Sequence, residues 1–273
     1  IAKDIFSKNE ILKLFYYIKH NFKLNLLLTN NNIRHYKGSI NDSKITFTKH
    51  LQDDEFIRKN YGISSILTDY FVEDVRILCK NINFDYSPLD YFNKNKLKIN
   101  EIFNKLKNDK VENKSKINKY ILFRSILYKY IKQCDTFPYF VCLSIYYTFK
   151  PKKILDMSAG WGDRLISALM YEYSDYTGVD PNSKLQKRYK KIINTFKSKE
   201  SKNKFKVIQS PFEDVNLDGK YDLMFSSPPY FIAEHYSKDT DQAYIKYSNL
   251  NSWLNNFMFK SIDKIWKHLE TGG

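Results

Sequence analysis

The chain has 273 residues, 42% of them hydrophobic and 16% aromatic, which suits one large domain or two ordinary ones and excludes a globally disordered chain. The formal charge of +15 favours an anionic partner, with nucleic acid the commonest soluble one, although a Lys- and Asn-rich composition bias explains such an excess equally well. No apolar run approaches the roughly 20 residues that span a bilayer, and no signal peptide is visible, so a membrane partner is not expected.

Residues 1–133 are expected to form a mostly helical, basic N-terminal region. Apolar residues at helical spacing predict helices over 11–18 and 121–131. The polar segment 30–50 fits a loop or a short hairpin, and the Asn- and Lys-rich stretch 93–119 fits an exposed helix or a linker. The positive charge is concentrated here and is densest in 94–132, which holds 12 basic and 3 acidic residues. This density predicts contact with a nucleic-acid backbone.

Residues 134–273 alternate between short apolar runs and amphipathic segments. Strands are predicted at 152–157, 175–180, 204–209 and 221–226. Helices are predicted at 164–172, 183–196 and 251–269. Strands that alternate with helices indicate an α/β fold with a Rossmann-like parallel sheet and right-handed crossovers.

The first predicted strand ends in "DMSAGWGD", and ligands of such sheets bind beyond the carboxyl ends of the strands. Gly160 and Gly162 permit a tight turn and a close approach of the backbone to a ligand. A pyrophosphate-binding loop would place a third glycine where Leu165 stands, so a pyrophosphate cofactor is disfavoured. The acidic residues instead suit a ligand with a positive amine and no phosphate.

The next two strands also end in residues that suit a nucleoside. A carboxylate at the position of Asp180 can accept both hydroxyls of a ribose, and capping of the following helix by Asn182 or Ser183 is the structural alternative. The third strand runs into "SPFED", where an adenine ring would lie against Phe212.

The fourth strand ends in "SSPPYF", residues 226–231. Two prolines forbid helix and provide no N–H donor, so the carbonyls of Ser227 and Pro228 can accept from an amino group. Tyr230 can stack on a flat ring. This turn therefore suits a planar substrate that bears an amine, and a purely structural turn is the alternative.

The stretches "ILDMSAGWGDRL", "TGVDPN" and "SSPPYF", in this order, resemble class I S-adenosylmethionine-dependent methyltransferases. More narrowly, they resemble the DNA amino-methyltransferases, whose catalytic motif is D/N/S-P-P-Y/F/W. The resemblance covers about 137–273 and implies methyl transfer to adenine N6 or cytosine N4 in DNA. It also implies three further strands after "TGG". Adenine-specific members usually carry Asp or Asn where this chain has Ser227, and Ser is commoner in cytosine-specific ones, so the target base stays open.

The resemblance also implies roles for individual residues. Asp156 and the loop after it would line the methionine end of S-adenosyl-L-methionine, Asp180 would hold the ribose, and Phe212 would border the adenine. The implied cofactor site consists of Phe137, Pro138, Asp156, Ser158, Ala159, Gly160, Asp180, Asn182, Ser210, Pro211 and Phe212. The implied catalytic site consists of Ser227, Pro228, Pro229 and Tyr230.

Other functions remain open. The chain can be a nucleic-acid-binding module with an inactive methyltransferase scaffold, or a methyltransferase of RNA, of protein glutamine or of a small molecule. Residues 235–247 are either a lid over the substrate or a connecting loop.

The cysteines and histidines predict neither disulfides nor a metal site. The three cysteines form no C-x-x-C pair, and the five histidines are scattered without metal-ligand spacing. Cysteine usage fits a reducing compartment, cytoplasmic or nuclear. The start at Ile and the end at "ETGG" predict a fragment, or a trimmed or processed chain.

Overall fold

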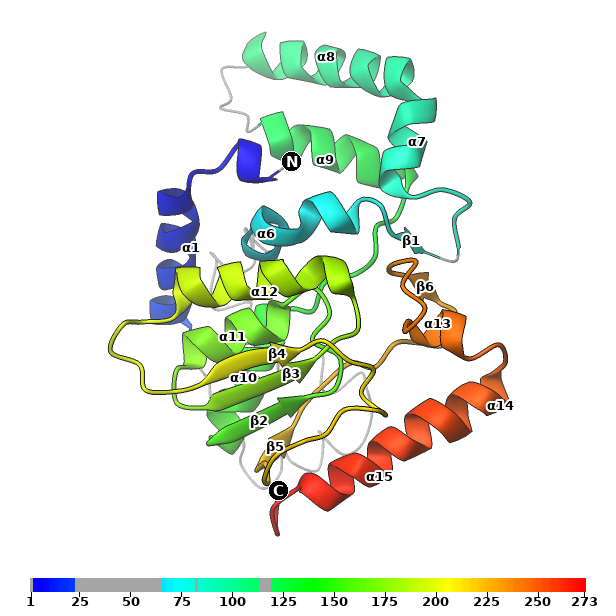
Figure 1. Cartoon of the computed structure of the whole chain (residues 1–273). Coiled ribbons are helices and arrows are strands. Elements are labelled where there is room, and N and C mark those ends of the chain that lie inside the picture. Colours follow the sequence, from blue (N-terminus) through cyan, green and yellow to red (C-terminus); the bar gives the residue numbers. More distant parts are fainter. Residues whose placement is uncertain (1, 23–64, 82, 113–118) are drawn as a thin grey trace, which may run out of the picture.

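A four-stranded parallel sheet forms the centre of the computed structural model, which describes residues 2–22, 65–81, 83–112 and 119–273 (Figure 1). The strand order is β4-β3-β2-β5. The strands are β2 (Lys153–Asp156), β3 (Asp175–Val179), β4 (Phe205–Ile208) and β5 (Leu223–Met224). They coincide with the four predicted strands, so the α/β class with a parallel sheet, compatible with a Rossmann-like fold, is confirmed.

The parallel register brings the carboxyl ends of all four strands to one edge of the sheet. Asp156 at the end of β2 pairs with Gly178 of β3, and Val179 pairs with Ile208 of β4. The residues that follow β3, β4 and β5 therefore emerge at the edge where Asp156 lies. This is the shared edge that the strand-end residues predict.

Alternating side chains of the strands face two separate layers of helices. Ile154 of β2 belongs to the cluster under α10 (Tyr139–Phe149), α11 (Asp163–Tyr171) and α12 (Ser183–Phe196). Leu155, the next residue, belongs to the cluster on the other face, with Trp253 and Phe257. That face is covered by one long helical stretch, in which α14 (Leu250–Trp253) and α15 (Phe259–His268) flank a π-helical turn at Leu254–Met258 (Figure 1).

The N-terminal region is mostly helical where it is described. It contains a 3-10 turn at Ala2–Asp4 and the helices α1 (Lys8–Asn21), α6 (Ile66–Arg76), α7 (Pro88–Lys94), α8 (Lys96–Glu112) and α9 (Lys119–Tyr130). The predicted loop or hairpin at 30–50 lies outside the described residues. Most of 93–119 is helix α8, and 113–118 also lies outside the described part of the chain.

Helices α1 and α6 pack directly on the layer of helices above the sheet. Phe15 of α1 stacks on Phe196 of α12 with ring centroids 4.3 Å apart, and Phe71 of α6 meets the same ring edge-on. Side chains from both sides of residue 134 therefore share one hydrophobic core. No helix among the described residues is both long and apolar enough to cross a membrane.

A short β-ladder links the N-terminal region to the segment that follows "SSPPYF". Strand β1 (Lys80–Asn81) pairs antiparallel with β6 (Glu234–His235). The thiol of Cys79 donates a hydrogen bond to the carbonyl of Tyr236, with a distance of 2.8 Å. This ladder holds β6 and helix α13 (Ala243–Lys246) beside the carboxyl edge of the sheet (Figure 1).

Candidate ligand-binding site

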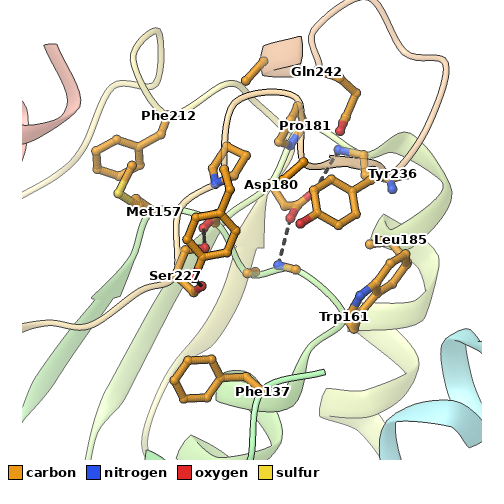
Figure 2. A pocket seen from close by; sticks show the side chains of 18 of the residues that line it. Phe137, Met157, Trp161, Asp180, Pro181, Leu185, Phe212, Ser227, Tyr236 and Gln242 are labelled. Carbon is orange, nitrogen blue, oxygen red and sulfur yellow. Dashed lines mark hydrogen bonds between the residues drawn. The ribbon is translucent and has the colours of Figure 1, made fainter. Parts of the chain in front are cut away.

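A cavity of about 460 Å³ opens at the carboxyl edge of the sheet (Figure 2). Its walls come from the loops that follow all four strands, from the segment before α10, from Asn81 of β1 and Asn83, and from residues within 233–243. The predicted site residues that line it are Phe137, Ser158, Ala159, Gly160, Asp180, Asn182, Pro211, Phe212, Ser227, Pro229 and Tyr230. The cavity thus gathers most of both predicted sites into one space.

The glycine loop after β2 is held close to β3. Gly160 and Gly162 have φ angles of +56° and +96°, which a residue with a Cβ rarely adopts. A Cβ on Gly178 of β3 would lie 2.9 Å from Tyr176 Cε1 and 3.1 Å from the Cβ of Ala159, so glycine lets the loop lie close to β3 without crowding. The amide of Ala159 donates to the carbonyl of Val179 at 2.9 Å, which fixes the loop in this position.

Asp180 lies at the centre of one wall, with its carboxylate held by backbone donors. Its oxygens accept from the amides of Gly160 at 2.8 Å and Asn182 at 2.9 Å, and only 7% of the residue is exposed. Burial raises the pKa of Asp180 to about 6, against the lowering effect of the two donors. The side chain of Asn182, not that of Asp180, caps α12 by accepting from the amide of Lys184. The two backbone donors use only part of the acceptor capacity of this carboxylate, which also interacts with the hydroxyl of Tyr189.

Asp156 lies beneath the cavity and not in its lining. Its carboxylate accepts from Arg164 Nε at 2.8 Å, Tyr176 Oη at 2.5 Å and Ser226 Oγ at 2.7 Å. The structure thus places Asp156 as a support that ties β3, α11 and the "SSPPYF" turn to the end of β2. The sequence pattern showed a carboxylate at a strand end but not the arginine eight residues later that neutralises it.

Three further predicted residues also lie outside the lining. Pro138 is the N-cap residue of α10, and the hydroxyl of Ser210 donates to the carbonyl of Pro211 at 2.8 Å. Pro228 lies within the turn between the lining residues Ser227 and Pro229.

The "SSPPYF" turn is fixed on the glycine loop and presents an aromatic ring at the cavity. The hydroxyl of Ser158 donates to the carbonyl of Ser227 at 2.6 Å, and Ser227 Oγ lies 2.9 Å from Tyr230 Oη. Phe231 adopts a φ of +49°, a sparsely populated conformation for a residue with a bulky side chain. Tyr230 is 63% exposed, so its ring is accessible to a flat partner.

Three buried polar atoms on residues that line the cavity have no hydrogen-bond partner among the described residues: Asn182 Nδ2, Glu213 Oε2 and Gln242 Nε2. The other oxygen of Glu213 accepts from Lys246 Nζ at 2.8 Å and Tyr247 Oη at 2.5 Å. A buried polar group left without a partner costs about 1–3 kcal/mol. Two unpartnered donors and one unpartnered acceptor on residues that line one cavity favour a site for a polar ligand.

Sequence reasoning missed several lining residues. Three of them lie inside or next to the glycine loop in the sequence: Trp161, Asp163 and Arg164. Their position beside Gly160 and Gly162 could have indicated that they line the cavity. Asp163 accepts from Thr68 Oγ1 at 2.5 Å and from the amide of Phe137 at 3.2 Å. Burial raises the pKa of Asp163 to about 6.

Other missed residues come from distant segments: Asn81, Asn83, Asp135 and Thr136. Asn81 ends a two-residue strand and Asn83 follows it, and neither belongs to a periodic pattern, so nothing in the sequence connects them with the sheet. Residues 235–247 include Tyr236, Asp241 and Gln242, so part of this segment forms a wall of the cavity.

No group of three or more His, Cys, Asp or Glu side chains in the described part of the chain is placed to hold a metal ion. Comparisons with protein-family models, with curated proteins and with solved structures find no match for this chain. A functional conclusion therefore depends on the chemistry of the cavity.

Proposed function

We propose that this chain is an S-adenosyl-L-methionine-dependent methyltransferase that modifies the exocyclic amine of a base in DNA, adenine N6 or cytosine N4. One observation carries the proposal. A single cavity collects the buried carboxylate after β3, the glycine loop after β2 and the "SSPPYF" turn after β5. The first two suit a nucleoside cofactor, and the third suits a planar amine.

The polar atoms of the cavity fit the adenosyl part of the cofactor. The carboxylate of Asp180 suits the ribose hydroxyls, and the unpartnered Glu213 Oε2 suits the amine of an adenine ring beside Phe212. The volume lies within the roughly 300–1,000 Å³ range of small-molecule sites. When bound, the cofactor supplies an electrophilic methyl group on its sulfonium.

The residues of the turn would hold and orient the target amine. The lone pair of an exocyclic amine is conjugated with its ring, which makes the amine a poor nucleophile. Acceptors at Ser227 Oγ and at the Pro228 carbonyl would pull its hydrogens and favour a pyramidal nitrogen. Holding two reactants in line lowers a barrier by roughly 7–11 kcal/mol. A base must leave the duplex to reach the cavity, and stacking on Tyr230 would offset part of that cost.

Replacing Asp180 by asparagine is expected to weaken binding of S-adenosylmethionine by about 1.5–3 kcal/mol, the contribution of a hydrogen bond to a charged group. Asparagine keeps the shape and one acceptor oxygen, but it loses the charge and one of the two backbone hydrogen bonds, because the two amides donate to different oxygens of Asp180. Calorimetric titration of wild type and variant measures the difference. Asp175→Asn, at the opposite end of β3, is the matched control and should bind as wild type does.

The pH dependence of the same titration tests the ionised state. Because the pKa of Asp180 is raised to about 6, the carboxylate is charged above that pH and protonated below it. Wild-type affinity should therefore be level above pH 7 and fall by up to about tenfold per pH unit below 6. Asp180→Asn should flatten this profile, and a remaining slope would come from another acid of the cavity, such as Asp163, whose pKa is also raised to about 6. Equal affinities at pH 7 in folded proteins would contradict the ribose-binding role.

The basic N-terminal helices are expected to contact the nucleic-acid backbone. Lys96, Lys98 and Lys105 of α8 are exposed. Each lysine that no longer neutralises a phosphate should reduce the slope of log affinity against log salt by about 0.9, and a triple Lys→Gln variant should reduce it by up to about 3. Fluorescence anisotropy with a labelled duplex at several salt concentrations gives the slope.

A control triple variant separates a specific contact from the overall charge. Three other exposed lysines lie where β4 begins, at the edge of the sheet opposite the cavity: Lys199, Lys202 and Lys204. Their replacement by glutamine makes the same change in net charge. If both triple variants alter the slope equally, the lysines of α8 are solvated charge and not a binding surface.

A further inference from the structure

Gln242 is a buried residue of the cavity wall that the proposed mechanism does not use. It is 5% exposed, and its Nε2 has no hydrogen-bond partner within the described residues. Figure 2 shows its side chain at the same end of the cavity as Pro181 and Asp180. A neutral donor and a buried carboxylate thus lie at the same end of one cavity.

The backbone around Gln242 is fixed by contacts that do not involve its side chain. Asp239 Oδ2 accepts from both the amide and the hydroxyl of Ser183, each at 2.9 Å, which ties this segment to the start of α12. The amide of Gln242 donates to the carbonyl of Asp239 at 3.0 Å, and its own carbonyl accepts from Ile245 and Lys246. These contacts fix the backbone of Gln242, while Nε2 has no hydrogen-bond partner among the described residues.

The pairing of Asp180 with Gln242 matches the chemistry of a hydroxyl group. A hydroxyl donates one hydrogen and accepts through its lone pairs. The carboxylate can only accept when it is ionised, and the amide nitrogen can only donate. We propose that Gln242 Nε2 donates to a sugar hydroxyl of the bound nucleoside that itself donates to Asp180. Gln242 would then select ribose over deoxyribose, an inference that rests on the proposed function.

The test compares the affinities of wild type and one variant for three nucleosides that differ in their sugar hydroxyls. Gln242→Met keeps the length of the side chain and removes the donor. Competition titrations against S-adenosylhomocysteine give the affinities for adenosine, 2′-deoxyadenosine and 3′-deoxyadenosine. The variant should bind S-adenosylhomocysteine and adenosine about three- to tenfold more weakly than wild type, the usual effect of one neutral hydrogen bond. One of the two deoxynucleosides should bind wild type and variant equally, because it lacks the hydroxyl.

Thermal unfolding separates a ligand contact from a structural role. An apolar side chain of similar size in place of an unpartnered buried donor is neutral or stabilising, so the Tm of the free variant should not fall. Gln209→Met changes an exposed glutamine just after β4 and should leave all affinities unchanged.

Three outcomes would overturn the proposal. If wild type binds S-adenosylhomocysteine and Gln242→Met binds it within twofold, this inference fails and the proposed function stands. If the affinities for all three nucleosides fall by the same factor in the variant and its Tm drops, Gln242 supports the fold and does not bind a hydroxyl of the ligand. If wild type binds none of these ligands, the proposed function fails together with the inference.

Discussion

Asp156→Asn is expected to lower the free energy of unfolding by about 3–5 kcal/mol, the usual cost of breaking a buried ion pair from one side. Both side chains of the Asp156–Arg164 pair are almost completely buried, and Arg164 Nε lies 2.8 Å from Asp156 Oδ2. Burial lowers the pKa of Arg164, but the carboxylate of Asp156 more than offsets this and raises it overall, so the guanidinium stays charged. The variant would leave this charge in the core without its counter-charge.

Urea unfolding of single and double variants at pH 7 checks this expectation. Arg164→Met removes the charge that Asp156→Asn would leave without a partner. The double variant should therefore lose clearly less stability than the sum of the two single losses. A loss below about 1 kcal/mol for Asp156→Asn would place the pair among weakly contributing contacts. Strictly additive losses would show that the two side chains act independently.

Tyr230→Ala is expected to reduce kcat/KM for methyl transfer by about tenfold or more, while the affinity for S-adenosylmethionine stays the same. Base–aromatic stacking contributes roughly 1–3 kcal/mol per base, and the exposed ring of Tyr230 is placed to provide it. Tyr230→Phe and Tyr230→Trp should keep much of the activity, because stacking needs a ring and not a hydroxyl. Single-turnover rates with a saturating duplex isolate the transfer step.

Ser227→Ala should slow transfer in the same assay with little effect on cofactor affinity, because it removes an acceptor for the target amine. The matched control is Tyr173→Ala, since Tyr173 is 71% exposed and lies away from the cavity. A structural role for the turn predicts a different pattern, in which Tm, cofactor affinity and rate fall together in the Tyr230 and Ser227 variants. That pattern would contradict a direct contact with the base.

The sheet and its edge could be predicted because each element has its own local signal. The four strands are short apolar runs, each followed by turn residues, and the apolar positions of 183–196 repeat with helical spacing. Parallel strands must bring their carboxyl ends to one edge, so the strand-end residues could be assigned to one site without any known contact. The local patterns therefore decided both the fold class and the position of the cavity.

Residues whose positions depend on long-range pairing could not be predicted. Strands β1 and β6 have two residues each, too few for a periodic pattern, yet their pairing places Asn81 at the cavity. Gln242 and Glu213 belong to the site because of unpartnered atoms, which become apparent only when the surrounding packing is known. Asp156 was predicted to line the cofactor site but is a structural support outside the lining, for the same reason. Arg164 and Tyr176 bind its carboxylate from other elements, and no local pattern shows these contacts.

The most direct test of the proposed reaction is mass analysis of nucleosides after incubation of the full chain with S-adenosylmethionine that carries a deuterated methyl group. DNA and RNA should be present together, and the protein itself should be digested and analysed as well. The proposal predicts deuterated N6-methyladenine or N4-methylcytosine in the DNA, with little or none from the Ser227→Ala and Tyr230→Ala variants. Label only in RNA or on protein glutamine, or no label in any fraction although the cofactor binds, would contradict it.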